Sequence, residues 1–365
     1  MVATTIIGLA IGCNDADPKQ QSPDTGTDDT DHTGDVDDAD VPQWPGQDIR
    51  ESPLGVDWDM PEADDGFRVL VANIGNVDIH RCANVDYNMC WTEQEEIVAG
   101  EIALRDPDII LLQEVLVPEQ CDGIADSVGE DHACHPDHRP DEPEQVRRLV
   151  GDGYTISCDS RFGYECVAAR ATEGFAIQGC DTGDLCRDHA RTGDVVDGCD
   201  PGFSVSAVTV EVDGQPIDFV NVHPPSDMAS NAAECRYEMF QDFFGEDAPL
   251  IENDAVFVGG DFNFDPYRAS ANDPDVALWH DHVFYSYDDT HDDTLSFAYH
   301  SGIVEHDPPY YTSPIINRTL DHAISNSLTG RCITLGAHPG EAPLDHLHGN
   351  MADRLDHMAL DCVLQ

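Results

Sequence analysis

Polar side chains stand at the points where apolar, strand-length runs of this sequence end. Carboxylate, amide and imidazole groups recur there, at Asn73, Glu114, His223, Asp261, Asn263, Asp321, Asp356 and His357. Strand ends on one edge of a sheet can converge in space although they lie far apart along the chain. We therefore expect these side chains to form one site.

A site of this composition has the groups that hydrolysis of a phosphate ester requires. Carboxylate and amide oxygens bind a hard cation, a carboxylate can deprotonate water, and imidazolium groups donate to phosphoryl oxygens. Each residue alone also has a simpler interpretation. Glu114 could cap a loop, His223 could be a hydrogen-bonded histidine at a strand end, and Asp–Asn pairs are common in turns. The chemical interpretation therefore depends on the whole set.

The elements that would position these side chains are mostly strands. Apolar runs predict strands at 67–73, 108–114, 166–169, 203–212, 217–222, 255–260, 319–325, 332–335 and 355–361. Amphipathic stretches predict helices at 93–104 and 230–244, and Asp213-Gly214 predicts a hairpin turn. Residues 120–200, rich in Cys, Gly, Asp and His, are expected to be irregular and cross-linked. The chain is thus a mixed α/β protein without internal repeats.

The charge balance is strongly acidic. The 365 residues include 73 Asp or Glu against 17 Lys or Arg, a formal charge of −56, and Lys19 is the only lysine. This composition excludes a strongly basic nucleic-acid clamp, and no apolar run reaches the length of about 18 residues that a membrane-spanning helix needs. Two explanations of the acidity stay open: solubility in salty surroundings, where self-repulsion is screened, and a GC-rich genome that encodes Arg in place of Lys.

The first 65 residues have the composition of an export signal followed by a tether. Cys13 follows a short apolar segment, as in a bacterial lipoprotein signal (1–13), although no Lys or Arg precedes that segment and a chance cysteine is the alternative. Residues 14–65 are rich in Asp and poor in apolar residues, which predicts a disordered linker. We expect one folded, monomeric domain at 66–365, anchored by lipid at the outer membrane, periplasm or cell surface, or extracellular.

The number of cysteines is typical of an exported protein with disulfides. Of the 13 cysteines, the 12 after Cys13 form an even set, which is typical of disulfides in an oxidising compartment. No Cys-x-x-Cys pair occurs, so a structural zinc site is not expected. Three close pairs could close local loops, although sequence does not fix the connectivity: Cys82/Cys90, Cys158/Cys166 and Cys180/Cys186.

Six sequence blocks resemble, in order, those of the endonuclease/exonuclease/phosphatase superfamily, which includes deoxyribonuclease I and bacterial sphingomyelinases. They are VLVAN at 69–73, ILLQE at 110–114, VNVH at 220–223, VGGDFN at 258–263, TLDHAIS at 319–325 and RLDH at 354–357. The QE and GDFN blocks are the most specific. The resemblance covers residues 67–362 and implies a single-domain, four-layer α/β/β/α sandwich and a divalent-metal-dependent hydrolase of phosphate esters.

The resemblance also implies roles for the matched residues. Glu114 looks like the principal Mg²⁺ ligand, supported by Asn73 and Asp356, with Ca²⁺ or Mn²⁺ as other candidate ions. Asp261 is similar to the carboxylate that orients or deprotonates the attacking water, and Asn263 to the amide that binds a phosphate oxygen. His357, held by Asp321, would act as general acid/base or polarise the phosphoryl group, with His223 as the second histidine across the phosphate.

The last blocks depart from the family pattern. The final block usually reads Ser-Asp-His, whereas Leu355 stands before Asp356 here, and the fifth block commonly has Tyr where this chain has His322. A further Leu-Asp-His occurs at 344–346 and is interpreted as part of a loop. The exact part played by Asp356 is therefore open.

The phosphate ester itself is not determined by the motifs. An extracellular or surface nuclease stands first, although the acidity argues against tight, unaided DNA binding. A sphingomyelinase-like lipid phosphodiesterase or a small-molecule phosphatase stands second, and a non-catalytic surface binding module is the alternative from a different class. Aromatic residues at 284–311 could stack on bases or enter lipid, or they could be the core of paired strands.

Overall fold

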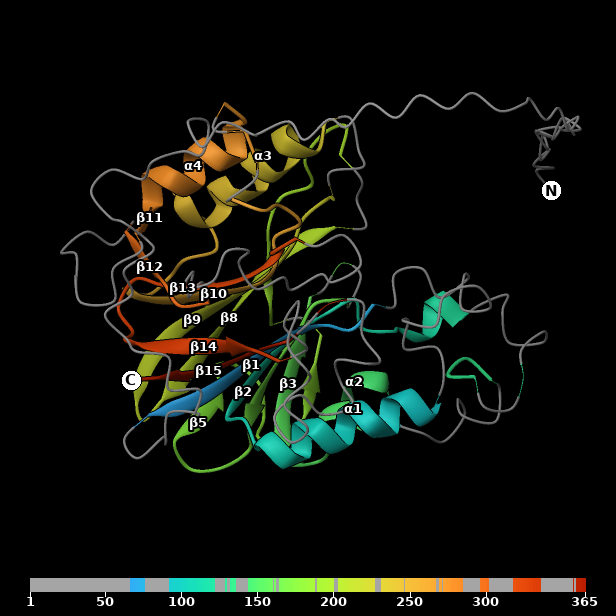
Figure 1. Cartoon of the computed structure of the whole chain (residues 1–365). Coiled ribbons are helices and arrows are strands. Elements are labelled where there is room, and N and C mark those ends of the chain that lie inside the picture. The colour runs from blue at the N-terminus through green and yellow to red at the C-terminus, as the bar shows by residue number, and fades with distance from the viewer. Residues whose placement is uncertain are drawn as a thin grey trace, which may run out of the picture. The chain divides into compact units, whose positions relative to one another are not determined.

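Two β-sheets pack face to face between two layers of helices, as Figure 1 shows. The structure, a computed structural model, describes residues 66–75, 92–121, 129, 132–135, 144–159, 161, 164–187, 189–199, 203–226, 231–245, 247–266, 269–270, 272–284, 296–301, 318–335, 357 and 359–365. All of them belong to one compact unit, residues 41–365. The predicted signal (1–13), the predicted linker (14–65), Cys82, Cys90 and Asp356 lie outside the described residues.

The first sheet is centred on two parallel strands of the predicted blocks. Its order is β14 (Gly330–Thr334), β15 (Leu360–Leu364), β1 (Phe67–Asn73), β2 (Ile109–Gln113), β4 (Cys166–Arg170), β3 (Tyr154–Cys158) and β6 (Leu185–Cys186). Strands β1 and β2 run parallel, and β15 and β4 flank them antiparallel.

The second sheet also has a pair of parallel strands at its centre. Its order is β11 (Val283–Phe284), β12 (Phe297–Tyr299), β13 (Asp321–Ser325), β10 (Ala255–Asp261), β9 (Gln215–His223), β8 (Ser204–Val212) and β5 (Phe175–Ile177), with β7 (Arg191–Thr192) also paired to β8. Strands β9 and β10 run parallel, and β8 and β9 form the hairpin predicted at Asp213-Gly214.

Helices cover the outer face of each sheet. The helices α1 (Thr92–Arg105) and α2 (Gln145–Val150) lie on the first sheet, whereas α3 (Ala232–Phe244) and α4 (Pro274–His282) lie on the second (Figure 1). A short 3-10 helix spans Pro118–Cys121. No helix among these is long and apolar enough to cross a membrane.

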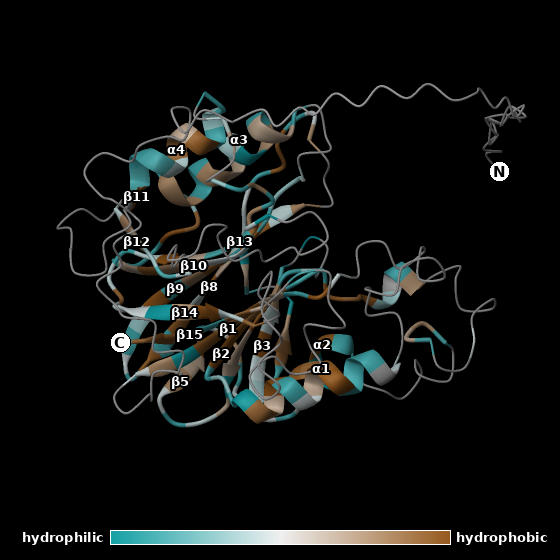
Figure 2. Cartoon of the chain, in the orientation of Figure 1, coloured by the Kyte–Doolittle hydropathy of each residue, from teal (hydrophilic) through white to brown (hydrophobic). Residues whose placement is uncertain are grey.

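Alternating side chains fill three apolar layers because both faces of each central strand are covered. In β1, Leu70 and Ala72 face α1 and α2, while Val69 and Val71 enter the layer between the sheets. On the far side, aromatic residues such as Phe240 and Trp279 pack between the second sheet and its helices. Figure 2 shows hydrophobic residues concentrated along the strands of both sheets. The predicted four-layer α/β/β/α sandwich is confirmed.

The structure differs clearly from the sequence expectations in two places. Residues 120–200 contain α2 and the strands β3 to β7, so this region is more regular than expected. The last strand begins at Leu360, after His357, rather than at 355. In the aromatic segment, Phe297 and Tyr299 are buried in β12, as the core interpretation predicts for these two residues.

Five disulfides link the described cysteines. Two of them are the predicted local pairs, Cys158–Cys166 and Cys180–Cys186. The other three join Cys121 to Cys134, Cys199 to Cys235 and Cys332 to Cys362. A protein with this many disulfides fits an extracellular or periplasmic compartment.

Candidate active site

Strand direction brings the predicted residues to one edge of the two sheets. Because β1 and β2 are parallel and Asn73 is the register partner of Gln113, Asn73 and Glu114 leave their strands side by side. In the second sheet, β9 and β10 are parallel and end at His223 and Asp261. Strand β13 is antiparallel to β10, so its first residue, Asp321, faces Asp261.

The side chains form one continuous series of contacts across both sheets. The Nδ2 atom of Asn73 donates to Glu114 Oε1 at 3.1 Å and to Asp261 Oδ2 at 3.0 Å. On one side, His223 Nε2 lies 3.3 Å from Glu114 Oε1. On the other side, His357 Nε2 lies 3.6 Å from Asp261 Oδ2. Two imidazoles therefore flank a pair of carboxylates that share one amide.

Asn73 is fixed in the orientation that serves both carboxylates. Its Oδ1 accepts a hydrogen bond of 2.9 Å from the backbone N–H of Gly75, so its amino group must point toward Glu114 and Asp261. Glu114 leaves β2 with a left-handed φ of 58°, an unusual conformation for a residue with a side chain. This turn directs its carboxylate toward the site, where the side chain is 17% exposed.

His357 and Asp321 form the predicted Asp–His pair. His357 Nδ1 lies 2.9 Å from Asp321 Oδ2, which leaves Nε2 turned toward Asp261. Ligand atoms of these three residues all lie within 4.8 Å of one another. Burial raises the pKa of Asp261, and Asp321 adds to the rise, while His357 and His223 oppose it. Asp261 is thus a carboxylate with an increased affinity for a proton.

His223 is held between two glutamates. Its Nδ1 lies 3.5 Å from Glu165 Oε1, opposite the contact with Glu114, and the Phe203 ring packs edge-on at 5.1 Å. Burial alone would lower the pKa of His223, but Glu114 and Glu165 outweigh it and raise the pKa to about 10. Burial also raises the pKa of Glu165 to about 7, against the opposing effect of His223. The imidazole is therefore a cation at neutral pH.

Asn263 lies beside Asp261 in a tight turn. Its φ is 55°, its N–H donates to Asp261 Oδ1 at 2.8 Å, and its Nδ2 donates to Pro224 O at 2.9 Å. The buried guanidinium of Arg236 donates to Asn263 O at 3.2 Å and to Asp275 Oδ2 at 2.6 Å. The second hydrogen of the Asn263 amide is the group that it can offer to a phosphate oxygen.

Of the eight predicted residues, seven lie in the described part of the chain and meet at this edge; Asp356 does not belong to that part. The sequence did not identify Glu165, which accepts a 2.6 Å hydrogen bond from Ser204 Oγ and reaches His223. A polar residue directly before the predicted strand at 166–169 was the available signal. His322, which departs from the family pattern, is buried between Tyr299 Oη at 2.8 Å and Phe264 O at 3.1 Å, and burial lowers its pKa to about 4.

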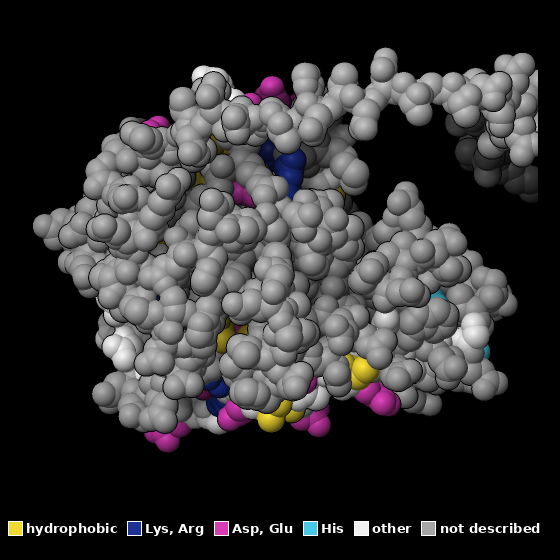
Figure 3. Space-filling view, in the orientation of Figure 1, with side chains coloured by type: hydrophobic (Ala, Val, Ile, Leu, Met, Phe, Trp, Pro, Cys, Tyr) yellow, Lys and Arg dark blue, Asp and Glu magenta, His cyan; other side chains and the backbone are white. Residues whose placement is uncertain are grey.

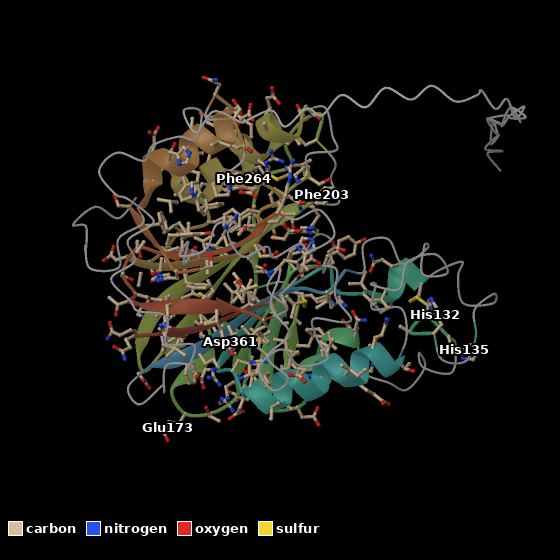
Figure 4. All side chains as sticks on the ribbon, viewed as in Figure 1. His132, His135, Glu173, Phe203, Phe264 and Asp361 are labelled. Atoms are coloured by element: carbon tan, nitrogen blue, oxygen red, sulfur yellow. A yellow bond between two sulfur atoms is a disulfide. The ribbon has the colours of Figure 1, made fainter. Side chains whose placement is uncertain are left out.

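Figures 3 and 4 show the whole chain in the orientation of Figure 1, as a surface and with side chains as sticks. Figure 4 labels Phe203 and Phe264 on the side of the second sheet, whereas Asp361 lies in the first sheet. Asp361 is engaged away from the site, with Arg68 Nε and Arg105 Nη1 each at 3.3 Å. In Figure 3, acidic side chains reach the surface at the top and bottom of the view, in keeping with the net charge of −56.

Comparison with known proteins gave matches among solved structures only. No family model matches the chain, and no curated protein matches it. D. rerio TDP2 complexed with single strand DNA product is 13% identical, with a TM-score of 0.48 over 83% of this chain and 100% of that one. The human Nocturnin catalytic domain with bound sulfate anion is 16% identical, with a TM-score of 0.48 over 82% and 94% of the two chains. A beta toxin from Staphylococcus aureus is 9% identical, with a TM-score of 0.46 over 81% and 99%.

Proposed function

We propose that this protein is an exported phosphodiesterase of the endonuclease/exonuclease/phosphatase superfamily, which hydrolyses phosphate esters by metal-assisted attack of water. One observation carries the proposal: the unbroken contact series from His223 through Glu114, Asn73 and Asp261 to His357. A purely structural cluster would have no need of two imidazoles that flank a pair of carboxylates. The order of the six sequence blocks supports the same assignment.

The donor set fits a hard divalent cation. Glu114 offers a partly exposed carboxylate at the centre of the series, and such oxygen ligands suit Mg²⁺, Ca²⁺ or Mn²⁺. Glu114 would hold the ion together with Asp356 as the sequence predicts. Asn73 directs its amino group at the carboxylates, which orients them, and its role as a ligand stays a prediction. When bound, the ion would neutralise charge on the phosphoryl oxygens.

The remaining residues supply proton transfer and positioning. Asp261, whose pKa burial raises, would orient the attacking water and accept its proton. His357, with Nδ1 held by Asp321, would present Nε2 to the phosphoryl group as a donor. Cationic His223 would donate from the opposite side, and the second amide hydrogen of Asn263 would bind a phosphate oxygen. The close contact of Asp261, Asp321 and His357 could also accept a metal, but the Asp–His hydrogen bond favours the acid–base assignment.

A phosphodiester is the substrate class that we favour, with nucleic acid first and phospholipid or a small phosphate ester second. An anionic ester that approaches a chain of net charge −56 must be met by positive charge within the site itself. Two imidazoles and a divalent ion meet that need. We further propose secretion of the protein through the predicted lipoprotein signal, with the five disulfides in support.

The deciding experiment measures hydrolysis of plasmid DNA, RNA, sphingomyelin and bis-p-nitrophenyl phosphate by the full chain. Each substrate is tested with Mg²⁺, Ca²⁺ or EDTA, at low and high salt. His357→Ala is compared with the matched control His189→Ala, because His189 is exposed and outside the contact series. Metal-dependent cleavage that is lost only in the His357 variant supports the proposal, and the preferred ester identifies the subclass. Failure to cleave any of them would favour a surface binding module.

A further inference from the structure

The β3–β4 hairpin carries Glu165 to the candidate active site, and a disulfide closes this hairpin next to it. Cys158 is the last residue of β3 and Cys166 the first of β4, and the two are direct register partners. Their disulfide joins Cα atoms 4.0 Å apart. Cys158 is 2% exposed and Cys166 1% exposed, so the bond is buried in the apolar layer between the first sheet and its helices rather than open to solvent.

Hydrogen bonds at the end of the hairpin, next to the disulfide, fix the backbone around Glu165. The N–H of Asp159 donates to Glu165 O at 2.9 Å, and the N–H of Glu165 lies 3.3 Å from Asp159 Oδ2. The backbone of the neighbouring Tyr164 accepts a 2.9 Å hydrogen bond from the N–H of Val115, directly after Glu114. The hairpin end is thus tied to both glutamates that contact His223.

The disulfide and Glu165 lie on opposite faces of the same strand end. Cys158 and Cys166 pack in the helix-covered layer, whereas Glu165 reaches across the space between the sheets to Ser204 Oγ and His223 Nδ1. Burial of a carboxylate costs free energy, and a backbone movement that exposed Glu165 to water would remove that cost. A covalent link one residue away restricts that movement more than hydrogen bonds of the hairpin alone can.

We propose that the Cys158–Cys166 disulfide is a positioning device that holds Glu165 against His223 Nδ1 and so keeps His223 oriented for reaction. The inference rests on the proposed function. The Cys158–Cys166 disulfide thus contributes to turnover as well as to stability, and its effect on turnover acts through Glu165. Substrate binding through the other residues of the site does not depend on it.

The chain offers a matched control. Cys332 and Cys362 are also register partners in adjacent antiparallel strands, with Cα atoms 3.8 Å apart. They lie in β14 and β15, at the other end of the strand order of the same sheet. Both are at most 3% exposed, and neither adjoins a residue of the contact series. Removing this bond tests what loss of a buried cross-strand disulfide does in general.

The kinetic test compares the double variants C158A/C166A and C332A/C362A with the full-length wild type on bis-p-nitrophenyl phosphate and Mg²⁺, well below the melting temperature of each. We expect kcat of C158A/C166A to fall by about tenfold or more while KM changes by less than about threefold. The kcat of the control should stay within about twofold of the wild-type value.

A second comparison tests whether the disulfide acts through Glu165. In a Glu165→Gln background, removal of Cys158–Cys166 should change kcat by less than about twofold, because both changes act through one residue. Equal kcat in C158A/C166A and the wild type, or full additivity with Glu165→Gln, would overturn the inference.

A second readout does not need activity. Hydrogen–deuterium exchange of peptides that contain Val115 and Glu165 should be at least about tenfold faster in C158A/C166A than in wild type, and unchanged in C332A/C362A. Unchanged protection in C158A/C166A would contradict the positioning role even if no substrate were found. A wild type that cleaves no ester would instead count against the proposed function, so the two failures are distinguishable.

Discussion

Asp261 and Asp321 are register partners across β10 and β13, and His357 contacts both of them. The charge of Asp321 adds to the rise that burial causes in the pKa of Asp261, and the imidazole of His357 opposes that rise. The arrangement explains why Asp321 binds Nδ1 of His357 while Asp261 lies on the Nε2 side. In the proposed mechanism, Asp321 orients the ring and Asp261 receives a proton from water.

Replacing Asp321 by Asn should reduce turnover without loss of the fold. The amide keeps the shape of the side chain but no longer stabilises an imidazolium or fixes the Nδ1 proton. We expect kcat to fall by about 10²- to 10⁴-fold, the range of general acid–base contributions. The measurement is steady-state hydrolysis beside circular dichroism, with Asp213→Asn in the exposed β8–β9 turn as control. Turnover within a factor of about two of wild type would remove Asp321 from the proposed site.

Replacing Glu114 by Gln should weaken metal binding itself. Loss of one partner that merely orients a ligand costs about 10- to 100-fold in affinity, and a neutral amide in place of the central carboxylate should cost at least as much. Calorimetric titration with Mn²⁺ measures this directly, and EDTA should abolish wild-type hydrolysis. Glu173→Gln serves as the control, because Glu173 is exposed and does not belong to the contact series. Undiminished Mn²⁺ affinity in Glu114→Gln would locate the ion elsewhere, with Asp261, Asp321 and His357 as the next candidates.

Much of the central architecture could be predicted from the sequence. The strands β1, β2, β9 and β10 are short apolar runs because helices and the opposite sheet cover both of their faces. Each of these strands is followed or ended by a polar residue at the point where the helices and the opposite sheet no longer cover it. This change from apolar to polar residues identified Asn73, Glu114, His223 and Asp261 in the sequence. By contrast, β3 carries Thr155 and Ser157 among its buried positions, and α4 contains three Asp or His residues in its last turns, so their apolar patterns are weak.

Glu165 could not be found by the same rule. It precedes β4, and the rule considered residues that follow an apolar run. Because β4 is antiparallel to β2, its first residue comes to the edge where β2 ends. Strand direction depends on pairing across the sheet, which the local sequence does not specify. Strand β13 is likewise antiparallel to β10, which brings its first residue, Asp321, to the edge where β10 ends. This strand begins two residues later than predicted.

Replacing Asp275 by Asn should destabilise the fold substantially. The guanidinium of Arg236 is 3% exposed and lies 2.6 Å from Asp275 Oδ2. Removal of the carboxylate leaves a buried cation without its counter-charge, a change that costs about 3–5 kcal/mol. Urea unfolding measures the loss, and the exposed Asp213→Asn change should cost far less. Arg236 also donates to Asn263 O, so we expect turnover of Asp275→Asn to decline as well. A loss below about 1 kcal/mol would show that the pair is solvated in solution.

Acid should destabilise the protein partly through His300. This side chain is buried between Ser325 Oγ at 2.6 Å and Gly330 O at 3.0 Å. Burial lowers its pKa to about 4 in the folded state, whereas the unfolded value is about 6.5. The unfolded chain therefore binds the proton more readily, so the contribution of His300 is complete above pH 6.5 and is lost as the pH falls toward 4. The full difference amounts to about 3 kcal/mol.

The measurement compares urea unfolding of wild type and His300→Gln at intervals between pH 7 and pH 4. His322 and His280, whose pKa values burial also lowers to about 4, titrate in the same direction in both proteins. The difference between the two curves therefore isolates His300. Gln can keep one hydrogen bond at this position but takes up no proton, so the variant should lose stability less steeply, by up to about 1.4 kcal/mol per pH unit. His189→Gln, at an exposed position, should run parallel to wild type. If His300→Gln also runs parallel, the pKa of His300 is the same in the folded and unfolded states, and the lowered pKa inferred from its burial is wrong.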